Sequence, residues 1–509
     1  MSKTLKPRRE GAVLAARPRP GAPRPYEFPA VVMDRLSNGL TVLIADLPGR
    51  PLVSASLVIR GGAADEPAAE GGSTVLAARA LSEGTEAHDA IQLVEAAERL
   101  GASIHADAGW DALSVSIDVP ADRLAPALAL AAEVLLRPTF PTPEVERLRD
   151  ERLNDLLQAQ ADPRRRAEHA FAATIYAPRS PYHRPSGGTR ETVERLTAQH
   201  LRRAYERALD PRRATMVVAG DLGGQQVLPL AQRLFGGWAG PAGAATGEPD
   251  AVLDSAASSR RIVHVVHRPG SVQTEIRIGH RGLPRRIPDF HAVSVMSAIL
   301  GGLFNSRLNM KLREEKGYTY GASAGFDMRR GAGPFAARAA VNTEVTVPAI
   351  LDMLGELEEM RASEVKPAEL AAARDFLIGV FPLRFETAGA VVGALSGLAV
   401  HGLEVEELIE YRERIEAVNA GAVAGAANAH LLVDAAAVVL VGDVDAFGAD
   451  LEVAGLGPIV IERDPIPELP PERGTVGPGP VDGDDQEGPT AGAEEPELPV
   501  APDDVVEAG

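Results

Sequence analysis

The sequence has no cysteine among its 509 residues. Disulfide bonds, thiolate metal sites and cysteine nucleophiles are therefore excluded. No apolar run approaches the roughly 20 residues that a membrane-spanning helix needs, and the N-terminal residues include no apolar stretch typical of a secretory signal. The nucleotide-binding motifs GxGxxG and the P-loop are missing. We therefore expect a cytoplasmic protein that has no membrane segment.

The net charge of −19 is unevenly distributed along the chain. Residues 464–509 contain 13 Asp and Glu and one Arg, whereas residues 1–26 contain seven Lys and Arg and one Glu. The body between these ends is acidic, which argues against nucleic acid as a partner and favours cationic ligands such as basic peptides. A charge that only keeps the protein in solution explains the same composition equally well.

Two long stretches of the chain mix strand-like alternation with helical spacing and close on similar sequences. The first closes on VVAGD, which ends at Asp221, and the second on VVLVGD, which ends at Asp443. This similarity indicates an internal duplication with an α+β character. The predicted boundaries are a disordered basic segment (1–27), an N-terminal half (28–235), a linker rich in Gly, Ala and Pro (236–259), a C-terminal half (260–464) and a disordered acidic tail (465–509).

A helix-like stretch, GSTVLAARALSEGT, covers residues 72–85. It follows an alternating strand-like run (53–60) and a Gly-rich turn with Asp65 and Glu66, and it closes on a Gly-Thr pair. This order resembles the insulinase-like metallopeptidases, the family that includes pitrilysin and the mitochondrial processing peptidase. The catalytic helix of that family carries an inverted zinc motif, H-x-x-E-H.

With the Gly-Thr end in register, the resemblance places the two His of the motif on Val75 and Arg79 and the Glu on Ala78. The third zinc ligand of the family, a Glu on a later helix, corresponds to Asp155. Two His four residues apart supply zinc ligands, and the Glu between them holds the metal-bound water. Val and Ala have no lone pair to offer, and an Arg repels a cation. We interpret the stretch as a helix that has kept its shape and lost its metal, and we expect no metal or cofactor in this chain.

A second motif, LGGLFNSRLNMKLREEKGYTYGASAG, covers residues 300–325 and resembles the substrate-binding segment of the same family. It has the Gly pair, the Ser-Arg-Leu helix, the later Leu-Arg and a Tyr seven residues after that Arg. The resemblance implies that Arg313 and Tyr320 bind the carbonyl of a peptide substrate and stabilise the tetrahedral intermediate. A guanidinium and a phenol are both suitable donors for an oxyanion. The alternative is that Arg313 forms an ion pair at a helix end and Tyr320 belongs to the core.

The resemblance extends over residues 31–444, and each half is expected to be an antiparallel sheet packed against helices. Some enzymes of this family have two chains, one with the zinc motif and one with the Arg-Tyr pair. The resemblance therefore implies a non-catalytic subunit, inactive alone, of a heterodimeric zinc-dependent endopeptidase with a clam-shell shape. Zinc belongs to a homologous HxxEH-bearing partner, the substrate is a peptide, and Arg313 and Tyr320 act in trans. Presequence processing is not expected, because LGGLFNSR is too short for the glycine-rich loop of the mitochondrial α-subunit.

Two alternatives stay open. The same fold without metal serves as a structural subunit in respiratory complexes, so the chain could be a metal-free structural or peptide-binding protein. A self-sufficient peptidase with a displaced metal site would need histidines that converge on the carboxylates 150, 151 and 155, and no histidine pair has that spacing. His264 and His267 lie three apart on a strand and point to opposite faces, which indicates structural or surface roles.

Overall fold

A computed structural model describes residues 21, 24–49, 51–240 and 260–463. All of these residues belong to one unit. We use "first half" for the described residues up to 240 and "second half" for those from 260. The predicted boundaries stay predictions, and the predicted basic segment, linker and acidic tail lie wholly or largely outside the described residues.

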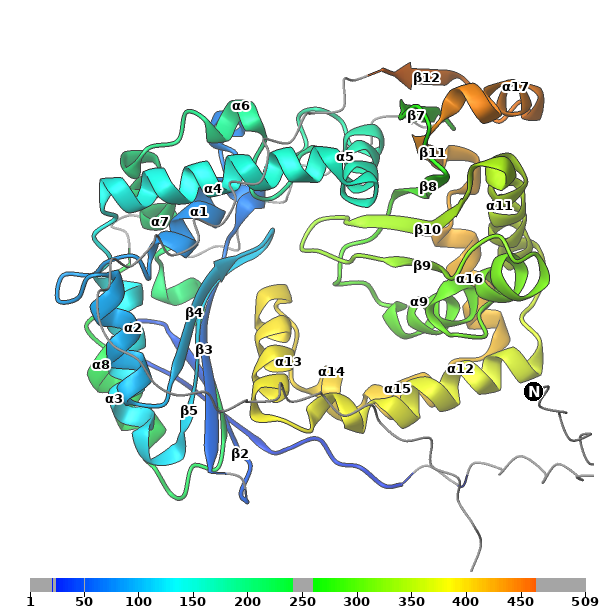
Figure 1. Ribbon diagram of the computed structural model, residues 1–509. Coiled ribbons are helices and arrows are strands. Elements are labelled where there is room, and N and C mark those ends of the chain that lie inside the picture. Colours follow the sequence, from blue (N-terminus) through cyan, green and yellow to red (C-terminus); the bar gives the residue numbers. More distant parts are fainter. Residues whose placement is uncertain (1–20, 22–23, 50, 241–259, 464–509) are drawn as a thin grey trace, which may run out of the picture. The chain divides into compact units, whose positions relative to one another are not determined.

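The first sheet has six strands in the order β1-β2-β6-β3-β5-β4 (Figure 1). Their bounds are β1 (Val31–Arg35), β2 (Thr41–Asp46), β3 (Leu52–Arg60), β4 (Ser103–Ala108), β5 (Ala112–Pro120) and β6 (Ala214–Gly220). β2 and β6 are parallel, and the other pairs are antiparallel. The turn from β1 into β2 uses Gly39 at a φ of 96°, a conformation that glycine adopts without steric cost.

The second sheet also has six strands, in the order β12-β7-β11-β8-β10-β9. Their bounds are β7 (Val263–His267), β8 (Gln273–Arg281), β9 (Ala322–Phe326), β10 (Pro334–Asn342), β11 (Ala437–Gly442) and β12 (Ile459–Glu462). β7 runs parallel to both β11 and β12, and the remaining pairs are antiparallel.

The α+β fold class is confirmed, but each sheet is mixed rather than wholly antiparallel. The strand that closes each half returns beside an early strand of the same half and runs in the same direction, as β6 does beside β2 and β11 beside β7. Parallel neighbours need a long crossover connection. The helices between these strands supply it.

The α-helices lie between the strands in chain order. In the first half they are α1 (Ser73–Ala80), α2 (Ala90–Arg99), α3 (Leu124–Leu136), α4 (Thr142–Ala161), α5 (Pro163–Ile175), α6 (Arg190–Val193), α7 (Ala198–Ala208) and α8 (Val227–Phe235). In the second half they are α9 (Phe290–Ser297), α10 (Arg307–Asn309), α11 (Thr346–Ala362), α12 (Pro367–Val380), α13 (Ala388–His401), α14 (Glu406–Ile409), α15 (Tyr411–Glu416), α16 (Ala420–His430) and α17 (Val444–Ala454). Most of them pack with their own sheet in one large core per half.

One helix from each half packs against the sheet of the other half. α13 lies against β3 and β6, where Leu395 and its neighbours pack on the apolar face that includes Val217. α5 lies against β8 and β11, where Phe171 packs with Val439. Figure 1 shows α13 in yellow beside the blue strands of the first sheet. A Cβ at Gly279 of β8 would lie 2.9 Å from Phe171 Cζ, so the absence of a side chain there admits the ring.

Among the described helices, no single one is long and apolar enough to cross a membrane. Two consecutive helical segments, residues 367–385 and 388–401, are long and apolar enough for a membrane span only when they are taken together. They are bent by 113° relative to each other. The apolar face of α13 in this pair is the one that covers the first sheet.

Candidate functional site

The N-terminus of α1 is anchored by the buried carboxylate of Glu66. It accepts hydrogen bonds from the backbone N–H groups of Gly72 at 2.9 Å and Thr74 at 2.6 Å, and it pairs with Arg184 at 2.8 Å. Burial raises the pKa of Glu66, although Arg184 and the backbone donors act in the opposite direction. A buried polar anchor of this kind fixes the helix without any metal ion.

The three positions aligned with the zinc motif lie on one face of α1, because they are three and four residues apart on the helix. Ala78 is buried, Val75 is half-buried and Arg79 is exposed. The Arg79 guanidinium lies 3.1 Å from Glu151 of α4. Arg79 is the only polar side chain of the three, and it is a cation. The face therefore keeps the geometry of a ligand-bearing helix and offers no metal ligand.

Asp155 of α4, which aligns with the third zinc ligand, is paired through both of its oxygens. Its Oδ1 lies 2.7 Å from Arg165 Nη2, and its Oδ2 accepts a hydrogen bond from Arg152. Partial burial alone would raise the pKa of Asp155, but the hydrogen bonds and charges of Arg165 and Arg152 outweigh it and hold the pKa below its ordinary value. Asp155 is thus an anion neutralised by two guanidinium groups.

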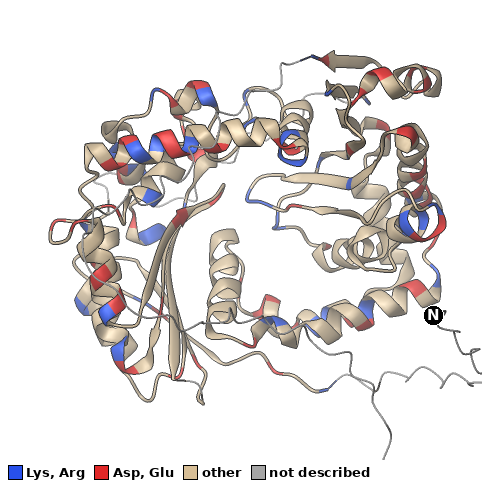
Figure 2. Cartoon of the chain, viewed as in Figure 1, with Lys and Arg blue, Asp and Glu red and all other residues tan. Residues whose placement is uncertain are grey.

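Arginines gather where the family's metal would lie. Burial lowers the pKa of Arg152, and the charges of Arg165 and Arg79 lower it further. Burial, followed by the charges of Arg152 and Arg165, lowers the pKa of nearby His169 to about 4, so its imidazole is neutral at pH 7. Figure 2 shows basic and acidic residues interspersed along the α4 ribbon. In the part of the chain that the structure describes, no group of His, Asp and Glu with metal-ligand spacing includes Asp155 or its neighbours, so the displaced-site alternative gains no support.

The motif predicted to bind substrate, in the second half, lies around two π-helical segments, η6 (Ala298–Gly302) and η7 (Met310–Glu315). π-helical turns are rare and frequently occur at functional sites. α10 connects the two segments, and the edge strand β9 follows them.

Several motif residues hold this segment in place. Arg307 forms two hydrogen bonds with Glu369 of α12, at 2.9 and 3.0 Å. The side chain of Asn309 accepts a hydrogen bond from Ala322 N–H at 2.8 Å. A Cβ at Gly301 would lie only 2.1 Å from the backbone nitrogen of Ala324, so this position requires glycine. These residues form the framework of the motif.

The two predicted substrate-binding side chains face outward from this framework. Tyr320 is 94% exposed, which excludes the alternative that it belongs to the core. The Arg313 guanidinium lies 4.5 Å from the ring centroid of Phe304, which is itself 69% exposed. Arg313 forms the ion pair at a helix end that the alternative expects, with its neighbour Glu314 at 3.6 Å near the end of η7. Among the described residues, no hydrogen bond, ion pair or ring contact joins Arg313 or Tyr320 to α1 or α4.

The two strand histidines have different partners. His264 Nδ1 lies 2.9 Å from Thr174 Oγ1, and its Nε2 lies 3.1 Å from Glu462. His267 instead lies beside Asp443 and Asp445. This second grouping was not predicted from the sequence, because the two carboxylates are far from His267 along the chain. The one available signal was the VVLVGD closure, which places Asp443 at the end of a strand.

Two family models match most of the region that forms the two sheets. Residues 41–184 match the model described as insulinase (peptidase family M16), and residues 195–377 match that of the peptidase M16 inactive domain. The non-peptidase homolog YmxG of Helicobacter pylori is 24% identical over 344 residues, which are 66% of this chain and 76% of that protein. An uncharacterized zinc protease of Mycobacterium leprae is 25% identical over 311 residues, which are 60% of this chain and 68% of that protein.

Solved structures share the fold. The crystal structure of a peptidase M16 inactive domain from Pseudomonas fluorescens has a TM-score of 0.74 at 25% identity and covers 81% of this chain and 98% of its own. The structure of a protease from Helicobacter pylori has a TM-score of 0.75 at 19% identity and covers 82% of this chain and 100% of its own.

Proposed function

The chain belongs to the insulinase family of peptidases, family M16, and because its α1 carries none of the zinc-binding side chains we propose that it is the non-catalytic subunit of a two-chain zinc peptidase. A homologous partner supplies the H-x-x-E-H helix and the zinc ion. This chain supplies Arg313 and Tyr320 across a clam-shell dimer that encloses a peptide. The name "non-peptidase homolog" of the Helicobacter pylori relative supports an inactive member. The cytoplasm stays its predicted location.

The observation that carries the proposal is the 94% exposure of Tyr320. A tyrosine this exposed adds almost nothing to folding, whereas the motif around it is built from buried and hydrogen-bonded residues. The Phe304 ring under Arg313 restricts the guanidinium and adds about 0.5–1 kcal/mol of cation–π attraction at an exposed site. These features support a role for the two side chains toward a group outside this chain.

The chemistry of this chain in the proposed complex is donation of hydrogen bonds. The partner's zinc supplies an activated water when bound. The N–H groups of Arg313 and the O–H of Tyr320 donate to the carbonyl oxygen of the scissile peptide, which becomes negative as the tetrahedral intermediate forms. Donors that are oriented in advance stabilise that charge more than they stabilise the ground state, and loss of one such donor typically costs about 10²–10³ in kcat.

The test is activity of the complex reconstituted from this chain and the H-x-x-E-H protein that co-purifies with it. We expect Arg313→Ala to lower kcat on a peptide substrate by about 10²–10³, with unchanged co-elution of the two chains. Tyr320→Phe, which removes only the hydroxyl, should also lower kcat. Lys316→Ala is the matched control, because it removes a cation three residues away outside the proposed pair. Full activity of the Arg313→Ala complex would refute the role.

A metal-free structural or peptide-binding protein is the second candidate. It is favoured by the edge strands β4 and β9, whose outer backbone groups have no neighbouring strand among the described residues. An extended peptide can add to such an edge as a further strand. Purification of this chain as a homodimer with no H-x-x-E-H protein would favour this candidate over the first.

A further inference from the structure

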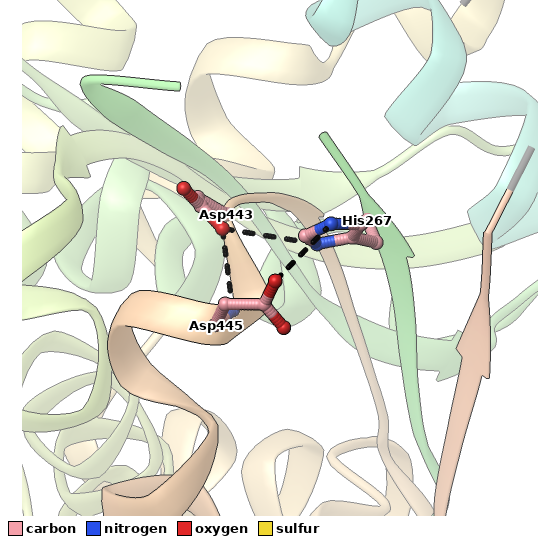
Figure 3. Close-up of side chains that lie close together, drawn as sticks. All are labelled: His267, Asp443 and Asp445. Atoms are coloured by element: carbon pink, nitrogen blue, oxygen red, sulfur yellow. Dashed lines mark hydrogen bonds and ion pairs between the residues drawn. The ribbon is translucent and has the colours of Figure 1, made fainter. Parts of the chain in front are cut away.

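We propose that His267, Asp443 and Asp445 form a binding site for a divalent transition-metal ion, in a part of the fold that the proposed peptidase role does not use (Figure 3). His267 is the last residue of β7, Asp443 follows β11, and Asp445 lies in the first turn of α17. One potential ligand atom from each residue lies within 4.8 Å of the other two.

The distances between the imidazole and the carboxylates suit a shared ion better than direct hydrogen bonds. His267 Nε2 lies 3.7 Å from Asp445 Oδ2, and Nδ1 lies 3.8 Å from Asp443 Oδ1. Both separations exceed the hydrogen-bond range. One imidazole binds an ion through one nitrogen, and Nδ1 already accepts from Val444 N–H, so Nε2 is the candidate ligand. Bonds of about 2.0–2.2 Å to one ion place neighbouring ligands roughly 3–3.5 Å apart, and the 3.7 Å between Nε2 and Asp445 Oδ2 is close to that separation. His267 is only 8% exposed, and among the described residues its Nε2 has no hydrogen-bond partner.

The carboxylate oxygens that point away from His267 are already oriented. Asp443 Oδ2 accepts a hydrogen bond from Gly270 N–H at 2.8 Å, and Asp445 Oδ1 lies 3.1 Å from Arg463 Nη2. Such outer contacts fix the ligand-bearing side chains in metal sites. Asp443 Oδ1 also accepts from the backbone N–H of Asp445 at 3.2 Å, which leaves a second lone pair for the ion.

The corresponding place in the first half, where the parallel strands β2 and β6 end side by side, shows which contacts the fold itself needs there. We call this place in each half the corner. There Asp221 follows β6 and accepts from Gly49 N–H at 3.0 Å, as Asp443 does from its own glycine. Asp46, the last residue of β2, accepts from Leu222 N–H at 3.1 Å. The corner is therefore held together by two carboxylates and two backbone N–H groups, without an imidazole.

In the second half His267 takes the place of Asp46, since each residue pairs with the glycine that ends the neighbouring parallel strand. Its Nδ1 takes over the structural bond by accepting from Val444 N–H at 3.3 Å. Asp445 stands where the first half has Gly223. The second half thus has two groups that the corner does not need, the Nε2 of the ring and the Asp445 carboxylate, and these two groups face each other.

One imidazole nitrogen and two carboxylates select a borderline cation such as Zn²⁺, Co²⁺ or Mn²⁺ over Ca²⁺ and Mg²⁺, which prefer oxygen ligands alone. Binding of the ion at Nε2 requires the tautomer with the proton on Nδ1, so the hydrogen bond from Val444 N–H is lost and the loss weakens binding. The positive end of the α17 dipole opposes a cation, and Arg463 competes for Asp445. We therefore expect a dissociation constant on the order of 1–100 µM rather than that of a structural zinc site.

The test is a Zn²⁺ titration of the full chain after dialysis against a chelator, followed by the ¹H–¹⁵N signals of the histidine imidazoles. The signals of His267 are identified by their loss in His267→Gln. We expect them to shift and saturate at one equivalent of Zn²⁺. Asp445→Asn should raise the dissociation constant at least tenfold without unfolding the protein, because that side chain is 65% exposed. Asp450→Asn, an exposed acid on the same helix, should bind as the unaltered chain does.

The proposal is overturned if the His267 signals do not move at millimolar Zn²⁺. It is also overturned if Asp445→Asn binds Zn²⁺ as tightly as the unaltered chain. In that case the ion is held elsewhere, for instance by the many carboxylates of residues 464–509. Neither result bears on the role of Arg313 and Tyr320, which is tested by activity of the complex.

Discussion

The two sheets share five strands in the same order and differ in the sixth. The shared series is β2-β6-β3-β5-β4 in the first half and β7-β11-β8-β10-β9 in the second. The sixth strand lies at the outer edge of each sheet. In the first half it is β1, which precedes the five shared strands in the sequence, and in the second half it is β12, which follows them. β1 is antiparallel to its neighbour and β12 is parallel. With nearly the same backbone in both halves, differences in chemistry between them must come from side chains.

The side chains show that the two halves diverged in opposite ways. In the first half, the positions predicted to correspond to the family's zinc motif are Val75, Ala78 and Arg79, and Asp155 is paired with arginines. In the second half, Tyr320 is exposed and Arg313 is partly exposed, next to a framework held by hydrogen bonds. α1 is held without a metal ion, because Glu66 accepts hydrogen bonds from the backbone at its N-terminus.

The largest effect on stability is expected for a feature that both halves share. In each half, one helix packs against the sheet of the other half. Phe171→Ala in α5 and Leu395→Ala in α13 both remove a side chain that is at most 2% exposed. We expect losses of about 3–5 and 2–5 kcal/mol in the free energy of unfolding. Urea unfolding measures both. Phe376→Ala is the control, because that ring is 48% exposed and should cost far less.

Similar losses for the two helices would mean that they contribute equally to joining the halves. A loss of stability below about 1 kcal/mol for either variant would show that this helix contributes little to joining the halves. A transition that splits into two steps in one variant would show which half depends more on the borrowed helix.

An intermediate effect on stability is expected at a position where equivalent strands of the two halves, β3 and β8, carry different residues. The pairing of β3 with β6 and of β8 with β11 makes Ile59 the counterpart of His280. His280 Nε2 accepts from Leu432 N–H at 3.0 Å, and its Nδ1 lies 2.8 Å from the carbonyl oxygen of Arg281. Burial lowers the pKa of His280 to about 4, because a second proton would cost a buried charge and one of these bonds.

A depressed histidine pKa stabilises the folded state above the unfolded value of 6.5, and this stability is lost as the pH falls toward 4. We expect His280 to account for about 2 kcal/mol of lost stability at pH 5. Urea unfolding at pH 7 and pH 5 measures the loss. His280→Ile, the residue of the first half, should reduce the pH dependence even if it lowers stability at pH 7. An unchanged pH dependence would show that other histidines account for it.

The smallest effect is expected at the exposed pair. Tyr320→Ala should change the free energy of unfolding by less than about 0.5 kcal/mol, because the side chain makes no hydrogen bond among the described residues and is 94% exposed. Tyr182→Ala in the first half is the contrasting variant. That ring is fully buried and packs against Trp110, so its loss should cost about 3–5 kcal/mol. A large effect of Tyr320→Ala on thermal unfolding would mean that the residue supports the fold.

The strands and the helix with the missing zinc motif could be predicted from the sequence, because alternation and turn residues are local signals. The closing strands before Asp221 and Asp443 were predicted for the same reason. The parallel pairing of those strands was not, because the partner of β6 lies at the other end of the half and no local pattern records it. The exchange of α5 and α13 between the sheets has the same cause, since an apolar helix face does not specify which sheet it covers.

The candidate sites divide in the same way. That Val75, Ala78 and Arg79 offer no metal ligand follows directly from their residue types. The exposure of Tyr320 could not, because the burial of a single aromatic depends on which elements pack around it. The pairing of Asp155 with Arg165 depends on how α4 meets α5, and the meeting of His267 with Asp445 depends on the return of β11 beside β7.

The exchanged helices also set the order in which the protein can be completed on the ribosome. The first sheet is fully synthesised at Gly220, but the helix that covers its second face ends only at His401. At typical translation rates the ribosome needs on the order of 10–30 s to cover that interval. During this time the nascent chain carries an uncovered apolar sheet face. We therefore expect translation pauses between these points to increase the demand for chaperones more than pauses after His401.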